Sequence, residues 1–167
     1  MSTRTAFVIV VISLIALIAG AFWTSTRPVP NTSTEMPDVS LAEFEDTLQR
    51  LEGQKPVVIN FWASWCPPCR GEADDLEKAW QEYGGRVEFI GIDIQNDTVE
   101  GALDFAREFD ISFRQIRDNT GRIGAKYRIT GVPGTFLITK SGQHVDEFRG
   151  AVTFELLGAS IEENLIN

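Results

Sequence analysis

The sequence predicts an α/β domain with a central mixed sheet that is flanked by helices on both faces. Three observations predict it. Apolar runs typical of buried strands, at 57–62 and 87–94, alternate with segments of helical periodicity, which favours parallel strands joined by helices. Turn residues then separate two further strand-like runs, at 135–139 and 144–149, as in an antiparallel hairpin. A last helical pattern, at about 153–166, completes the fold.

The N-terminal segment, residues 1–27, is apolar and carries no acidic side chain. As a helix, residues 6–23 would reach roughly 27 Å, close to the thickness of a bilayer core, about 30 Å. Arg4 precedes this run and two aromatic residues end it, so we expect the N-terminus to stay in the cytoplasm. The segment is therefore predicted to be a signal anchor, a single transmembrane helix that places the domain on the outer face of the cytoplasmic membrane. The alternative is a signal peptide that is cleaved near Ala21 and leaves a secreted domain.

A flexible linker rich in Pro, Thr and Ser is expected at residues 28–39, and residues 40–167 are then the folded domain. The domain begins with a helix at about 41–51, for which Ser40 or Asp38 supplies the N-cap. A turn rich in Gly and Pro leads from this helix into the first strand.

The middle of the chain is predicted to alternate helices, turns and short extended segments. Residues 67–83 have apolar side chains at helical spacing and are followed by two glycines. Asp97, with a glutamate three residues later, resembles the capping box of a helix that runs to about Phe109. We expect residues 111–116 to be a connecting or short extended piece, and residues 122–127 to be a short helix.

The only two cysteines, Cys66 and Cys69, lie three positions apart at the expected junction of a strand and a helix. A helix N-terminus stabilises a thiolate, the reactive form of cysteine. We expect Cys66 to be exposed there, with Arg70 adding positive charge, and Cys69 to lie further inside. Such a pair can close and reopen a disulfide with little backbone movement, whereas a zinc site usually needs a second pair of ligands.

Residues 61–70, with the sequence FWASWCPPCR, resemble the active site of the thioredoxin superfamily. They most resemble its membrane-tethered branch, the TlpA/ResA/CcmG-type thiol-disulfide oxidoreductases, and the similarity runs from about residue 43 to the C-terminus. The resemblance implies a thioredoxin-like fold with an inserted strand-helix unit within residues 95–117. It also implies that Cys66 and Cys69 form a redox-active disulfide, in which Cys66 attacks the substrate and Cys69 resolves the mixed disulfide.

Val132 and Pro133 match the loop that carries a cis proline in this superfamily. The resemblance implies a cis bond between them and a backbone surface that binds the substrate. Trp62 and Trp65 would form the apolar surround of the groove, so the predicted substrate-binding residues include Trp65, Val132 and Pro133. Gly134 departs from the family, which usually has a threonine there, and this loosens the loop.

A buried carboxylate helps to deprotonate the resolving cysteine in many thioredoxins, and Asn60 stands in its place. An amide cannot titrate, so the proton must leave through water or another acid. Some tethered relatives place an acid elsewhere near the site, and Asp97 is the best candidate by position, with helix capping as its alternative role. His144, the only histidine, is expected to be exposed and not to bind a metal.

Residues 28–167 carry 13 basic and 24 acidic side chains, a net charge of −11, which argues against nucleic acid and anionic lipid as partners. We predict an extracytoplasmic protein-disulfide reductase that uses no cofactor or metal and takes its electrons from a membrane-embedded thiol reductant. The resemblance implies disulfide-containing substrates such as apocytochrome c or copper-site assembly proteins, hence a role in cytochrome c-type biogenesis.

Two other activities were weighed against this prediction. A copper(I) metallochaperone could use the same cysteine pair, because thiolates are soft ligands for copper(I). Copper-delivery relatives of this fold usually add a distant histidine and a longer cysteine spacing, which this chain lacks. A peroxidase is disfavoured because peroxiredoxins place the attacking cysteine in a Thr-x-x-Cys context, which Ala63-Ser64-Trp65-Cys66 does not match.

Overall fold

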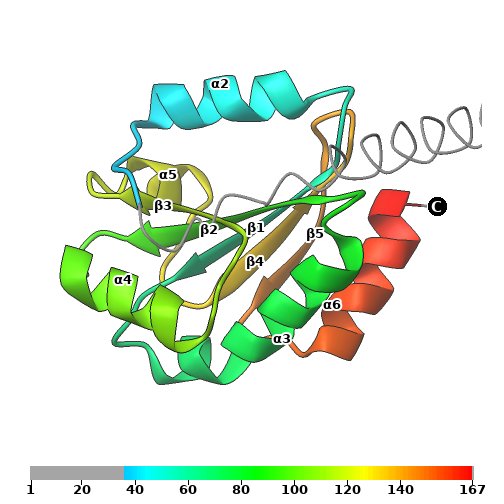
Figure 1. Ribbon diagram of the computed structural model, residues 1–167. Coiled ribbons are helices and arrows are strands. Elements are labelled where there is room, and N and C mark those ends of the chain that lie inside the picture. The colour runs from blue at the N-terminus through cyan, green and yellow to red at the C-terminus, as the bar shows by residue number, and fades with distance from the viewer. Residues whose placement is uncertain (1–35, 167) are drawn as a thin grey trace, which may run out of the picture. The chain divides into compact units, whose positions relative to one another are not determined.

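The computed structural model describes residues 36–166 (Figure 1). The expected anchor at residues 1–27 and most of the expected linker at 28–39 lie outside the described residues. Between residues 36 and 166 there is no helix with the length and apolar character that a bilayer span requires.

A single five-stranded mixed sheet has the strand order β3-β2-β1-β4-β5. The strands β1, β2 and β3 are parallel, and β4 runs antiparallel to both of its neighbours, β1 and β5. The predicted α/β class with a mixed sheet is therefore confirmed. The strands are β1 (Val57–Trp62), β2 (Glu88–Ile94), β3 (Arg114–Asp118), β4 (Gly134–Ile138) and β5 (His144–Arg149).

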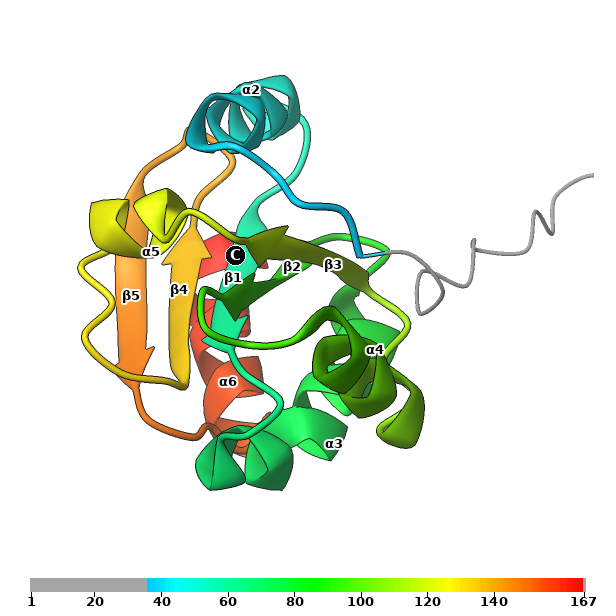
Figure 2. The ribbon, with the colours of Figure 1, turned by 90° about the vertical axis from the view of Figure 1, so that its left-hand side faces the viewer.

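Helices cover both faces of the sheet (Figures 1 and 2). On one face lie α2 (Leu41–Leu51) and α5 (Arg122–Lys126). On the other, α3 (Pro67–Tyr83) and α6 (Phe154–Ile161) pack with α4 (Val99–Glu108) into a second core. The expected helix at 153–166 is divided, because α6 gives way to a π-helical turn at Glu162–Ile166.

The central strand β1 contributes to both cores because side chains alternate along a strand. Val57, Ile59 and Phe61 belong to the core under α2 and α5. Val58 and Trp62 belong to the core under α3, α4 and α6. All six residues of β1 are buried, and each large apolar side chain among them stabilises the fold by roughly 1.5–3 kcal/mol.

The unit formed by α4 and β3 occupies the place where the inserted strand-helix unit was expected. The segment expected at 111–116 as a connecting or short extended piece is extended from residue 114, and it forms the strand β3, which pairs with β2 over five residues. The polar composition of β3 concealed it: Gln115 and Arg117 are buried, but they are held by side-chain partners and not by an apolar core. Residues 37–39 extend the sheet further, with Val39 N–H donating to Arg117 O at 3.0 Å.

Capping decides where two helices begin. Ser40 caps α2 in a complete capping box with Glu43, which confirms Ser40 as one of the two expected caps. The expected Asp97 cap of α4 is wrong: Thr98 is the N-cap, and its hydroxyl accepts the N–H of Gly101 at 3.0 Å. The Asp97 carboxylate contacts a different part of the chain instead.

Candidate active site

Cys66 and Cys69 form a disulfide at the start of α3, directly after the loop that follows β1. Cys66 is the N-cap residue of α3, and the two prolines that follow it occupy the first helical positions. There a missing N–H costs nothing, because the first donors of a helix have no acceptor within it. The Cys66 sulfur accepts the N–H of Cys69 at 3.2 Å, so a helix donor points at the sulfur and would stabilise its thiolate form.

The expectation that Cys66 is exposed is wrong for the disulfide form. Cys66 is 2% exposed and Cys69 is 1% exposed, and both belong to the core on the α3 side of the sheet. The physical reason is the bond itself, because Cys66 is joined to a cysteine whose side chain lies in that core. Trp65, immediately before Cys66, is by contrast 56% exposed. The disulfide is therefore largely covered in its closed form and lies next to an exposed tryptophan.

The peptide bond between Val132 and Pro133 is cis, as predicted from the resemblance. Gly134 begins β4 directly after it and pairs with Phe61 near the end of β1. This register brings the cis-proline loop to the same end of the sheet as the loop that carries the cysteines. Pro133 is buried and Val132 is half-buried.

Trp62 does not line a groove. It is 4% exposed, stacks on Phe105 of α4 with ring centroids 4.3 Å apart, and donates its indole N–H to Gln115 at 2.9 Å. Its position at the end of β1 turns it into the core, because alternation directs it to the side opposite Phe61. Of the two tryptophans expected around the groove, Trp65 alone is exposed.

The side chain of Arg70 contacts α4 and the residue that follows it. Its guanidinium forms an ion pair with Glu108 and lies 5.0 Å from the centre of the Phe109 ring. Arg70 is expected to add positive charge near Cys66. The ion pair with Glu108 of α4 offsets part of that charge.

Glu72 is a buried acid that sequence reasoning missed. It lies on α3 one turn after Cys69 and is 1% exposed. One carboxylate oxygen accepts the side-chain N–H of Asn60 at 2.9 Å, and the other accepts the backbone N–H of Val152 at 2.8 Å. Burial raises the pKa of Glu72 to about 7, against the opposing effect of these two hydrogen bonds. This carboxyl group can therefore gain or lose a proton near neutral pH.

The sequence does contain a signal for the burial of Glu72, because this charged residue lies on the apolar face of the expected helix. Residues three or four positions apart share a helix face, and Cys69 and Leu76, on the same face as Glu72, are buried. Asn60 stands where many thioredoxins have a carboxylate, and its side-chain amide donates a hydrogen bond to the carboxylate of Glu72. It also lines a small internal cavity together with Cys69. Asp97, the acid expected from the sequence, instead contacts Ser64.

His144 is exposed, as expected, and its ring lies 3.0 Å from the carbonyl oxygen of Asp146. In the described part of the chain, no three or more His, Cys, Asp and Glu side chains are grouped so that they could hold a metal ion.

The order of the strands, the helices on both faces and the disulfide at the start of α3 place the domain in the thioredoxin-like fold class. The match to known families is more specific. Residues 29–145 match the AhpC/TSA family, and the chain belongs to that family.

Named relatives are similar over most of the domain. The chain is 32% identical over 126 residues to the thiol-disulfide oxidoreductase ResA of Oceanobacillus iheyensis, covering 74% of this chain and 62% of ResA. It is 34% identical over 114 residues to a thiol:disulfide interchange protein DsbE homolog of Paracoccus denitrificans, covering 68% of this chain and 60% of that protein. The chain thus spans about three fifths of the length of these two relatives.

A solved structure shares the fold. It is that of a secreted Mycobacterium tuberculosis disulfide oxidoreductase homologous to Escherichia coli DsbE, with a TM-score of 0.62 and 26% identity. The alignment covers 69% of this chain and 85% of that one.

Proposed function

We propose that this protein is an extracytoplasmic, membrane-tethered thiol-disulfide oxidoreductase that reduces disulfides in other proteins. The observation that carries the proposal is the Cys66–Cys69 disulfide at the N-terminus of α3, in a member of the AhpC/TSA family. The proposed organisation is an anchor at residues 1–27, a linker at 28–39 and the thioredoxin-like domain at 40–167.

In the first step, the Cys66 thiolate attacks one sulfur of a substrate disulfide. The substrate S–S bond breaks, a mixed disulfide forms between Cys66 and the substrate, and the leaving thiolate takes up a proton. The helix N-terminus favours this step, because its donors stabilise the negative charge on Cys66. Trp65, Val132 and Pro133 form the surface on which the substrate strand rests.

In the second step, Cys69 loses its proton and attacks the Cys66 sulfur. The mixed disulfide breaks, the second substrate thiol leaves reduced, and the Cys66–Cys69 bond re-forms, so the substrate gains two electrons. Glu72 accepts the Cys69 proton, directly or through one water, because it lies one turn away on the same helix face and has a pKa near neutrality. A membrane-embedded thiol reductant then returns two electrons to the pair.

Exported proteins meet oxidising conditions, so a reductase there serves substrates whose cysteines must be kept free. The names of the relatives support thiol-disulfide exchange, and the resemblance to the TlpA/ResA/CcmG-type branch favours cysteines of apocytochrome c as the substrate. Copper-site assembly proteins present the same chemistry and remain the second substrate class.

The decisive experiment uses the full chain in its membrane and two cysteine variants. Cys66→Ser removes the attacking sulfur and is expected to abolish insulin-disulfide reduction, whereas Cys69→Ser is expected to accumulate a mixed disulfide on Cys66. Mass spectrometry of the trapped species identifies the substrate. Unchanged turnover by Cys66→Ser would refute the reductase.

Location is tested separately. Protease added to intact spheroplasts should digest the domain. Without protease, the domain should remain with the membrane fraction. A mature N-terminus at Phe22 would instead show cleavage and a released domain.

A further inference from the structure

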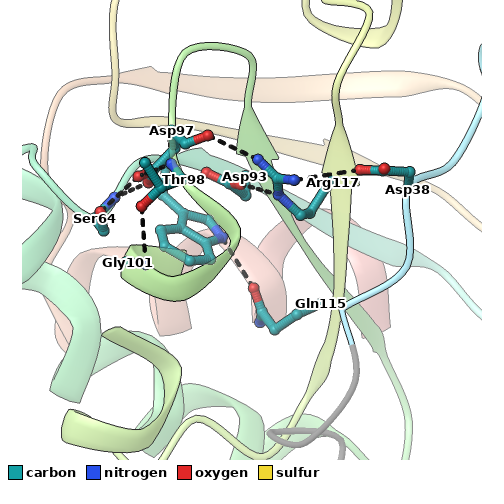
Figure 3. Close-up of polar contacts among 9 residues, drawn as sticks. Asp38, Ser64, Asp93, Asp97, Thr98, Gly101, Gln115 and Arg117 are labelled. Carbon is teal, nitrogen blue, oxygen red and sulfur yellow. Dashed lines mark hydrogen bonds and ion pairs between the residues drawn. The ribbon is translucent and has the colours of Figure 1, made fainter. Parts of the chain in front are cut away.

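Asp97 connects the start of α4 to the loop that precedes Cys66. One carboxylate oxygen, Oδ2, accepts the backbone N–H of Ser64 at 2.5 Å, and the other, Oδ1, accepts the Ser64 hydroxyl at 2.7 Å. Ser64 lies two residues before Cys66 and 33 residues before Asp97 in the chain. Figure 3 shows the two side chains facing each other across the gap between these loops. The contact is therefore a tertiary one, and it ends at residues 63–66, which we call the redox loop.

Helix capping does not account for Asp97, because Thr98 is the cap of α4. The Asp97 Oδ1 atom also accepts the N–H of Thr98 at 2.7 Å, which orients the carboxylate toward Ser64. The first turn of α4 packs closely against the same loop: a Cβ atom added to Gly101 would lie 2.8 Å from the Ser64 hydroxyl oxygen. The carboxylate and the small residue together keep α4 and the redox loop in one arrangement.

A buried arginine lies beside Asp97, between it and Asp38 (Figure 3). Arg117 of β3 is 6% exposed and donates from Nη2 to the carbonyl oxygen of Asp97 at 2.8 Å. Its Nε donates to Asp93 of β2 at 2.8 Å, and Asp93 is fully buried. Asp38 lies on the far side, 3.5 Å from Nη1. Because this guanidinium is held by one other strand, β2, and by the extended segment that contains Asp38, the backbone of Asp97 is fixed as well.

The redox loop is short and ends at the reactive residue. Cys66 N–H donates to the carbonyl oxygen of Ala63 at 3.1 Å, so Ser64 and Trp65 form the turn between them. Fixing Ser64 at both its N–H and its hydroxyl fixes this turn, and the turn sets the direction in which Cys66 enters α3. A misplacement of about 1 Å can cost an enzyme roughly 100-fold in rate, so the orientation matters.

We infer that Asp97 is a positioning residue for thiol-disulfide exchange, which acts by holding Ser64 and thereby the loop that presents Trp65 and Cys66. Asp97 acts through Ser64 and not on either sulfur. The inference rests on the proposed exchange at Cys66 but not on its direction, its substrate or the membrane anchor. Loss of all reaction in Cys66→Ser tests the exchange itself, so failure of the two proposals is distinguishable.

The test compares three variants of the reduced full chain in mild detergent, with neutral 4,4′-dithiodipyridine as the disulfide probe. Asp97→Ala removes both contacts and should lower the second-order rate constant about 10-fold. Asp97→Asn can still accept the Ser64 N–H and donate to its hydroxyl, although its NH2 group then loses the contact with the Thr98 N–H, so its rate should stay clearly above that of Asp97→Ala, within about threefold of wild type. Glu100→Ala, which removes an equal charge from the exposed first turn of α4, should leave the rate unchanged.

The pKa of the Cys66 thiol, from the pH dependence of iodoacetamide alkylation, separates position from charge. Both Asp97 variants lose the same negative charge, but only Asp97→Ala loses both contacts with Ser64. The Cys66 pKa should therefore be higher in Asp97→Ala than in Asp97→Asn. Equal pKa values and equal rates in the two variants, or a wild-type rate in Asp97→Ala, would overturn the inference.

Circular dichroism checks that each variant is folded. If Asp97→Ala does not fold, Ser64→Ala decides, because it loses only the hydroxyl contact. A rate about threefold below wild type then supports the positioning role, and an unchanged rate rejects it.

Discussion

Glu72 shows how one residue acquires a chemical role from its surroundings. A glutamate on a solvated helix face keeps its ordinary pKa, but this one is buried between α3, Asn60 and the backbone of Val152. Burial disfavours the charged form, and the two hydrogen bonds stabilise it enough to keep the pKa at about 7. A group with that pKa is suited to accept and return a proton at neutral pH.

Replacing Glu72 should slow the second step of the reaction and change its pH dependence. With wild-type protein, the rate at which Cys69 resolves the mixed disulfide should rise as pH passes about 7, where Glu72 ionises. Glu72→Gln cannot accept the proton, so its resolving rate at pH 7 should fall by about 100-fold. Stopped-flow kinetics of a mixed disulfide preformed on Cys66 measure this rate. Asp74→Asn, on the exposed face of the same helix, is the matched control, and equal rates for all three proteins would contradict the role.

The same pKa shift affects stability. Because the folded-state pKa of Glu72 is raised to about 7 from 4.5, the folded state binds more protons between these values. The free energy of unfolding of the wild type should then fall as pH rises from 5.5 to 7.5, by roughly 2 kcal/mol from this group. Asp93 has its pKa raised in the same direction, so the difference between wild type and Glu72→Gln isolates Glu72. Urea unfolding of the oxidised proteins at both pH values measures it, and a difference that does not change with pH would exclude the shift.

At the scale of elements, the side chain of Gln115 of β3 links three neighbouring strands, β1, β2 and β3. Its side chain is 3% exposed and accepts the indole N–H of Trp62 at the end of β1. The strand between them, β2, carries Gly91 directly beside Gln115 in the register. The absence of a side chain at Gly91 leaves the space that Gln115 occupies.

Gly91→Ala should therefore destabilise the protein. A Cβ atom at this position would lie 2.0 Å from the Gln115 side-chain oxygen, so the amide must move and release Trp62. The expected loss is about 1–3 kcal/mol, from overpacking together with an unsatisfied buried indole N–H. Urea unfolding of the full chain measures it. Gly71→Ala is the control, because a Cβ there meets no atom within 4 Å, and equal stability of both variants would show that the space is not needed.

At the scale of the whole molecule, the dominant feature is negative charge. The chain has a formal net charge of −9. Such a field attracts cations over a distance of about 10 Å at 0.1 M salt and less as salt increases.

The reduced protein should therefore react faster with a cationic disulfide than with an anionic one. At about 10 mM salt, cystamine should react at least about threefold faster than dithiodiglycolate, after correction for their intrinsic rates with a small thiol. The ratio should approach one at about 1 M salt, where the field is screened. A ratio that does not depend on salt would show that the acidity serves solubility alone.

The sequence by itself determined the sheet-forming runs, most helix positions, the cysteine pair and, through resemblance, the cis proline. These follow from local patterns: periodicity, caps, turn residues and a short motif. Tertiary structure alone decided what depends on neighbours distant in the chain. It buried Cys66, turned Trp62 into the core, paired the polar segment at 114–118 with β2, placed the Asp97 carboxylate on Ser64, and buried Glu72 against Asn60. The physical reason is that burial, pKa and hydrogen-bond partners are properties of packed surroundings, which no local pattern specifies.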